Sequence, residues 1–199
     1  MRRLRQRNQT RARLVAAGRR VIAAHGLEGA AVSAITDDAD VGVGSFYNYF
    51  TSKRELLNVI VAEAAALLGE VLNGRTGAMA DPAARVAVAV RHVVHLAGTD
   101  PTWAWFVLRA TDAVPRLAAS VTAPIEPHVR AGMASGRFTV DDPELAVNAV
   151  GGMMLHVMRA RLLGRVGPQA DRIAAEHVLR TLGLAPAAAR AVVQEVASG

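Results

Sequence analysis

The spacing of apolar residues is the feature that most restricts the fold of this chain. Along nearly all of its 199 residues, apolar side chains recur at intervals of three and four, and strict alternation of apolar and polar residues never lasts beyond a few positions. This spacing is typical of amphipathic helices, whereas half-buried strands require alternation. The sequence therefore predicts an all-α fold. Because 52% of the residues are apolar, the chain can fill a core, which excludes wholesale disorder.

Local signals predict where the helices begin and end. Gly26 follows the first apolar stripe and is a typical residue just after a helix. Ser52 and Glu55 have the spacing of a capping box at the start of a long helix. Asp-Pro pairs mark later helix starts, because Asp caps a helix and Pro suits its first turn. These pairs are Asp81-Pro82, Asp100-Pro101 and Asp142-Pro143.

Together these signals predict a chain of helices with few long connections. A Gly-rich linker is expected at 73–80, and three prolines divide 114–136 into shorter pieces. The expected helices span residues 10–25, 32–39, 43–49, 52–72, 82–97, 101–113, 143–163, 168–182 and 186–197.

The basic residues are concentrated at the N-terminus. Residues 1–54 hold ten Lys and Arg but four Asp and Glu, whereas the residues after 54 hold 13 of each. The first quarter of the chain therefore carries the whole net charge of +6. Such an imbalance predicts a polyanionic partner, either nucleic acid or an anionic membrane surface. The residues after 54 are expected to form a neutral second module.

Missing residue types and segments exclude several classes of protein. The chain has no Cys, which excludes disulfide bonds, thiolate metal sites and cysteine nucleophiles. Its longest uncharged run, residues 145–158, is too short and too polar to span a bilayer. No apolar segment follows the N-terminal arginines, as a secretory leader would require. We therefore expect a cytoplasmic protein without a membrane partner.

The segment from Val32 to Leu57 reads VSAITDDADVGVGSFYNYFTSKRELL. Two short helical stretches are separated by Asp40-Val41-Gly42, which leaves room only for a tight turn, and a capped helix follows at once. This segment resembles the DNA-binding domain of the TetR family of transcriptional regulators, strongly over residues 10–60 and only in architecture beyond them. The residues that carry the resemblance are Gly44, Tyr47, Tyr49, Phe50 and Lys53.

The resemblance implies a homodimer that binds a double-stranded DNA operator and a small-molecule effector. Residues 1–51 would form a three-helix helix-turn-helix domain, in which residues 1–9 are a flexible basic arm. Residues 52–199 would form a helical ligand-binding and dimerisation domain. The expected function is a ligand-responsive transcriptional regulator, a repressor released from a palindromic operator by a small apolar or aromatic molecule, and not an enzyme.

Four positions depart from the family pattern. Asp40 stands where the family has Gly, and Asp tolerates a left-handed turn at some cost. Gly42 replaces a Ser, which removes one hydroxyl suited to a phosphate, and Ala31 replaces a Thr cap. Arg19 stands where the family prefers an apolar residue. We expect the fold to survive all four, with looser packing of the first helix.

Groove chemistry assigns roles to the expected recognition helix. Small residues at its start would allow close approach to base edges in the major groove, and hydroxyl, amide and ammonium groups would bind phosphates or bases. Val41, Phe46 and Phe50 are expected in the core beneath it. The predicted DNA-binding residues are Val43, Gly44, Ser45, Tyr47, Asn48, Tyr49 and Lys53, with Ser33 and Thr36 as secondary candidates.

The second module has the composition of a ligand pocket and no enzyme motif. Methionines adapt to irregular ligands, aromatic rings supply walls, and a few polar groups orient the ligand. His92 and His95 have no third ligand at a metal-binding spacing, so we expect no metal and no cofactor. The predicted effector-binding residues are His92, His95, Trp103, Trp105, Phe106, Arg109, Met133, Met153 and His156, although each of them could instead be ordinary core or surface.

By the same resemblance, dimerisation is expected through the helices at 143–163 and 168–182. The predicted interface residues are Leu145, Ala149, Gly152, Leu155, Leu162, Ile173 and Leu179. Two alternatives remain for the whole chain. One is a helical metal- or cofactor-dependent enzyme, and the other is a basic protein that binds DNA or membranes without sequence preference.

Overall fold

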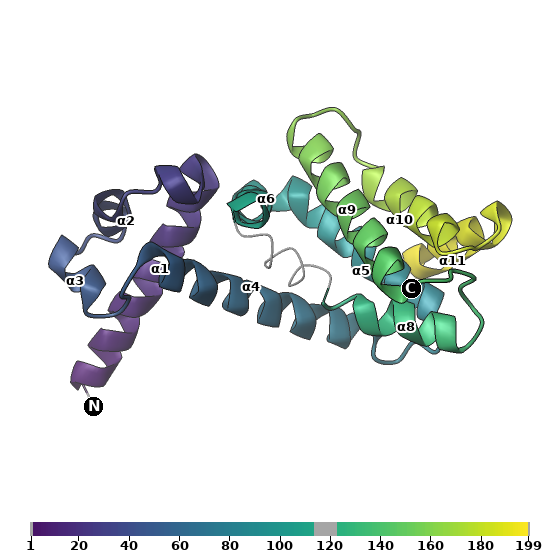
Figure 1. The fold of residues 1–199 in the computed structure, drawn as a ribbon, viewed down its shortest axis with the longest axis horizontal. Coiled ribbons are helices and arrows are strands. Elements are labelled where there is room, and N and C mark those ends of the chain that lie inside the picture. The colour runs from purple at the N-terminus through teal and green to yellow at the C-terminus, as the bar shows by residue number, and fades with distance from the viewer. Residues whose placement is uncertain (1, 114–122, 199) are drawn as a thin grey trace.

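The computed structural model describes residues 2–113 and 123–198. Within these residues the chain forms ten helices and no strand, so the predicted all-α fold is confirmed. The molecule is elongated, with α1–α3 at one end, α5 and α8–α11 at the other, and α4 running between them (Figure 1). None of the described helices is both long and apolar enough to cross a membrane.

The N-terminal end is built from three helices and the start of a fourth. α2 and α3 pack against each other, and α2 and α4 both pack against α1. The helices are α1 (Arg2–Gly29), α2 (Val32–Asp38), α3 (Val43–Tyr47) and α4 (Lys53–Thr76).

The second end is a bundle in which α5 lies at the centre. α5 packs against α4, α6, α8, α9, α10 and α11. The Asp-Pro starts are confirmed, since Asp81, Asp100 and Asp142 each accept a hydrogen bond from a backbone N–H two or three residues ahead. The helices are α5 (Pro82–Thr99), α6 (Pro101–Ala113), α8 (Glu126–Ala134), α9 (Pro143–Leu162), α10 (Ala170–Thr181) and α11 (Pro186–Ser198).

Helix α1 is longer than predicted at both ends. Residues 2–9 continue the helix where a flexible arm was expected, because Arg and Gln are good helix formers and neither Gly nor Pro interrupts them. Gly26 does take a left-handed backbone, with φ of 72°, and breaks the helix as predicted. One further turn, ending at Gly29, follows the break.

Helix α4 also extends beyond its predicted end, so part of the expected linker is helical. The hydroxyl of Thr76 is buried and donates to the Leu72 carbonyl, which holds the last turn against the core. At the other end, the Ser52 hydroxyl accepts from the Glu55 N–H at 3.2 Å. The Glu55 carboxylate accepts from the backbone and hydroxyl of Thr51, one residue further back than in a standard capping box.

One hydrophobic core runs through the whole described chain, from Leu14 on α1 to Val193 on α11. Two glycines allow close approach within it. A Cβ atom at Gly18 would lie 2.7 Å from Leu56 Cδ2, so a side chain there would force Leu56 of α4 to shift. A Cβ atom at Gly132 would overlap the Phe138 ring.

Helix α6 makes a second connection between the two ends of the molecule. It packs against α1 as well as against α5 and α9. Figure 1 shows α6 beside the C-terminal part of α1. A displacement in the C-terminal bundle can therefore reach α1 through α6, in addition to the covalent route along α4.

Candidate nucleic-acid interface and effector pockets

The turn between α2 and α3 has the geometry of a helix-turn-helix. Asp40 takes a left-handed backbone with φ of 51°, the only positive φ outside glycine among the described residues, as its place in the turn predicted. The Val41 N–H donates to the Thr36 carbonyl at 3.0 Å, which closes the C-terminal end of α2. Gly42 then precedes α3 with an extended backbone and supplies no side-chain cap.

Two arginines of α1 fasten this motif to the rest of the domain. Arg13 donates to the Asp40 backbone carbonyl at 2.9 Å and to its carboxylate at 2.8 Å. Arg20 donates to the Asp38 carboxylate through both Nε and Nη2, at 3.0 and 2.6 Å. Sequence reasoning missed both contacts, because it assigned the N-terminal charge to a polyanion. Part of that charge instead orients α2 and α3.

Helix α3 presents a face of small and polar side chains to solvent. Val43 and Tyr47 are exposed by 46% and 59%, and Gly44 and Asn48 are also exposed. Beneath this face, Phe46 is fully buried and Phe50 nearly so, as predicted, whereas Val41 is half-buried. The Tyr47 ring meets the Phe46 ring edge-on, with centroids 5.3 Å apart, so the core sets the position of an exposed phenol.

The remaining predicted DNA-binding residues differ in accessibility. Ser33 is exposed, and Ser45 and Tyr49 are half-buried. The prediction for Thr36 is wrong, because its side chain is fully buried and its hydroxyl donates to the Ser33 carbonyl at 2.9 Å. A buried group with its donor already used cannot reach a base.

Lys53 already has partners within the protein. Its ammonium donates to the Leu27 carbonyl at 3.1 Å and to the Glu28 carbonyl at 3.4 Å, at the C-terminal end of α1. A cation is favourable there, because the last carbonyls of a helix carry partial negative charge. The Lys53 side chain therefore ties the start of α4 to the end of α1, and it stands at the edge of the helix-turn-helix unit.

Two family models match the chain. The model described as "Bacterial regulatory proteins, tetR family" matches residues 14–60, which hold the helix-turn-helix. The model described as "Tetracyclin repressor-like, C-terminal domain" matches residues 81–195, more than half of the chain. The chain belongs to the TetR family. Its members are regulators, so the fold is that of a DNA-binding regulator with a ligand-binding domain rather than of an enzyme.

Solved structures of TetR-like regulators resemble the whole chain. RolR in complex with resorcinol is 30% identical, with 96% of this chain and 95% of that chain covered and a TM-score of 0.73. The transcriptional regulator FadR from Bacillus subtilis in complex with stearoyl-CoA is 21% identical, with coverages of 86% and 97% and a TM-score of 0.70. At that lower identity the likeness shows the fold alone. None of the curated proteins matches the chain in sequence.

The predicted effector-binding residues of this TetR-family protein differ in burial. Trp103 and Phe106 are buried in the core, whereas Trp105 is half-buried under the Arg109 guanidinium, 5.4 Å from its ring centroid. Met133 packs partly buried on α8. His156 is exposed. Composition identified these residues as a group but could not give the burial of each.

His92 and His95, two of the predicted effector-binding residues, lie close together. They line a pocket of about 220 Å³ with Arg75, Arg91 and Asp171, between α4, α5 and α10. Arg75 lies 3.2 Å from His92 Nδ1, and Arg91 lies 3.3 Å from the Asp171 carboxylate. Burial, followed by the charges of Arg75 and His95, lowers the pKa of His92 below its ordinary 6.5. No group of three potential metal ligands gathers among residues 2–113 and 123–198.

The predicted dimer face is partly exposed on α9 and α10. Leu145 and Ile173 are exposed by 69% and 48%, and Gly152 is also exposed. An apolar pocket of about 470 Å³ separates the two helices, with Met153 and Ile173 among its walls. The other predicted residues, Ala149, Leu155 and Leu162, are half-buried. The prediction for Leu179 is wrong, because Leu179 is fully buried in its own protomer and has no surface for a partner.

Two half-buried histidines predict a loss of stability in mild acid. Burial and the Arg85 charge also lower the pKa of His128, so His92 and His128 both resist protonation in the folded state. Below about pH 6.5 the unfolded chain then binds more protons than the folded one, and the free energy of unfolding falls as the pH decreases toward 5. His92→Gln combined with His128→Gln should flatten this fall in urea denaturation between pH 7.5 and 5.

The matched control is His25→Gln, because His25 is exposed at the end of α1. It should keep the pH dependence of the parent protein. An unchanged pH dependence in the double variant would contradict the assignment of the fall in stability to His92 and His128.

Proposed function

We propose that this TetR-family protein is a homodimeric transcriptional repressor that leaves a palindromic operator when a small apolar or aromatic molecule binds. The observation that carries the proposal is the exposed face of α3, which stands on buried Phe46 and Phe50. Arg13 and Arg20 hold the preceding turn and the end of α2 to α1. Residues 1–51 are the DNA reader, and residues 52–199 are the sensor and dimerisation domain. The protein acts in the cytoplasm, where operator DNA lies.

The side chains of α3 suit the major groove in different ways. Val43 can contact a thymine methyl group, and the Asn48 amide can pair with adenine. Gly44 keeps the start of the helix free of bulk. The phenols of Tyr47 and Tyr49, with the hydroxyls of Ser33 and Ser45, can donate to phosphates, which positions the helix without reading sequence.

Lys53 has a separate part in this proposal. Its ammonium carries three protons and has two carbonyl partners on α1, so one proton is left to donate to a phosphate. The phosphate would then lie near the N-terminus of α4, whose first N–H groups favour an anion.

Selection of duplexes from a random DNA pool should yield a palindromic operator. Tyr47→Phe should weaken binding to it roughly 30-fold, since a dimer loses two hydrogen bonds of about 1 kcal/mol each. Lys53→Gln should reduce the slope of log K against log salt by about 0.9 per phosphate contact. Asn48→Ala should change which base is selected. The control Arg130→Gln, on remote α8, should change neither the operator affinity, nor the salt dependence, nor the selected base. Equal binding of random and selected duplexes at physiological salt would refute the proposal.

Dimerisation through α9 and α10 follows from the apolar surface that one protomer leaves exposed. Leu145 and Ile173 lie outside the core, and the apolar pocket beside Met153 offers a partner side chain a place to insert. The exposed Gly152 allows two α9 helices to approach closely. Leu155 and Leu162 contribute their half-exposed flanks.

Ile173→Arg should convert the dimer into a folded monomer, because it places a charge on the proposed interface. Sedimentation velocity at micromolar concentration measures the change, and operator affinity should fall because a monomer covers one half-site. Val71→Arg is the control, since Val71 is an exposed apolar residue of α4 away from this face. It should remain dimeric. A dimeric Ile173→Arg protein would place the interface elsewhere.

The effector would act by favouring a dimer in which the spacing of the two α3 helices does not match the two half-sites of the operator. A ligand shifts such an equilibrium only through its different affinities for the two states. α6 contacts α1 directly, so a movement of α6 on ligand binding would turn the reader. The likeness to RolR, solved with resorcinol, supports a small aromatic effector.

Resorcinol should therefore release the protein from its selected operator and change its tryptophan emission, because both tryptophans of the chain lie on α6. Trp103→Phe should shift the resorcinol concentration that is needed without weakening operator binding in its absence. Fluorescence anisotropy of labelled operator measures both. Loss of operator binding in folded Trp103→Phe, with an unchanged resorcinol response, would contradict the division into reader and sensor.

A further inference from the structure

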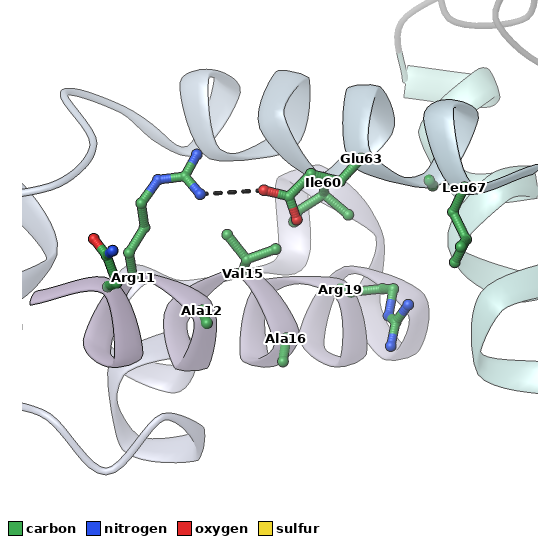
Figure 2. Close-up of a pocket in the computed structure, with 10 residues that line it drawn as sticks. Arg11, Ala12, Val15, Ala16, Arg19, Ile60, Glu63 and Leu67 are labelled. Carbon is green, nitrogen blue, oxygen red and sulfur yellow. Dashed lines mark hydrogen bonds and ion pairs between the residues drawn. The ribbon is translucent and has the colours of Figure 1, made fainter. Parts of the chain in front are cut away.

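A third pocket lies outside the C-terminal bundle, between α1 and α4. Its volume is about 540 Å³, within the usual range for small-molecule sites. Figure 2 shows α1 and α4 side by side with the lining residues between and around them. Its lining includes Arg11, Val15, Arg19, Ile60, Glu63 and Leu67.

The walls of this pocket are mainly apolar. Val15 of α1 is half-buried, Ile60 of α4 is almost fully buried, and Leu67 is 61% exposed. The Leu67 side chain is therefore largely exposed to water at the edge of the pocket. An apolar ligand in the pocket would cover part of Leu67, which is favourable because it removes apolar surface from water.

The charged groups of the pocket leave one cation without an acidic partner. Arg11 forms an ion pair with Glu63 at 3.1 Å and lies over the Phe50 ring, so its charge is neutralised at one end of the pocket (Figure 2). Arg19, two turns further along α1, makes no ion pair within the described residues. The net charge of the pocket is therefore positive.

Arg19 also has an unsatisfied donor. Its Nε atom is buried and meets no acceptor among residues 2–113 and 123–198. A buried N–H without a partner costs free energy, and for a charged group the cost is larger than for a neutral one. An acceptor brought into the pocket by a ligand would remove this cost.

We propose that the α1–α4 pocket binds an amphipathic carboxylate, with its anionic head on Arg19 and its apolar body against Val15, Ile60 and Leu67. A guanidinium suits a carboxylate because it donates parallel hydrogen bonds through its planar fork. The apolar walls favour an alkyl body over a polar one. Because Glu63 already neutralises Arg11, one negative charge balances the site.

Occupancy of this site would act directly on the DNA reader. The described lining residues belong to α1 and α4 alone, and α1 holds α2 and α3 through Arg13 and Arg20. A ligand between the two helices sets their spacing and thereby the position of α3. This coupling rests on the proposed function, whereas the binding site does not. If the coupling exists, operator DNA must change carboxylate affinity by the same factor.

Titration calorimetry on the full-length protein tests the site with three probes of equal chain length: decanoate, 1-decanol and decyltrimethylammonium. Decanoate should bind once per protomer, decanol at least tenfold more weakly, and the cation not at all. Arg19→Met keeps the length of the side chain and removes its charge, so it should abolish the advantage of decanoate over decanol. Arg130→Met, the same change on α8, should leave all three results unchanged.

Two further measurements separate this site from any other cavity. Ala64→Phe places a ring in the pocket and should block decanoate and decanol alike. In NMR spectra of the parent protein, decanoate with a nitroxide at its tail should broaden the amide signals of α1 and α4. This measurement does not depend on the folding of any variant. The proposal would be overturned if the broadening were confined to α5–α11. It would also be overturned if Arg19→Met and Ala64→Phe both left decanoate binding intact. If no operator exists, the calorimetric result still decides the binding site.

Discussion

The close packing of α1 against α4 at Gly18 is the contact on which the rest of the molecule depends. Because a Cβ atom there would lie 2.7 Å from Leu56 Cδ2, any larger residue on α1 would displace the Leu56 side chain. α4 thereby closes the core of the helix-turn-helix unit and also begins the C-terminal bundle. A displacement of α4 cannot leave α1 in place, and the fold has one continuous core rather than two independent ones.

Helix α1 is consequently the element through which the two ends of the molecule communicate. On one side Arg13 and Arg20 hold the turn and the end of α2. On another side α1 packs against α6 of the C-terminal bundle. Exposed ion pairs of this kind each contribute little to stability. Their geometric effect is larger, because two of them at different points fix the direction of a short helix-turn-helix on a long helix.

The positively charged residues of the N-terminal domain thus have different roles, which the net charge alone does not distinguish. Arg11, Arg13 and Arg20 meet carboxylates of the protein itself, and Lys53 meets carbonyls at the end of α1. Arg5 and Arg7 remain exposed on the first turns of α1. Arg19 is half-buried with an unpartnered donor beside a cavity. The sequence shows that the domain is basic. The location of each residue in the fold decides which charges pair within the domain and which face a partner.

The sequence by itself determined the helical class, the Asp-capped helix starts and the left-handed Asp40, because each depends on neighbours within a few residues. The burial of Phe46 and Phe50 was also predicted, as the core between the three N-terminal helices. Only the tertiary structure decided that Thr36 and Leu179 are buried and that His92 and His95 share a pocket. It also decided that a pocket opens beside Arg19. These properties depend on which helix lies opposite, and periodicity gives the face of a helix but not its partner.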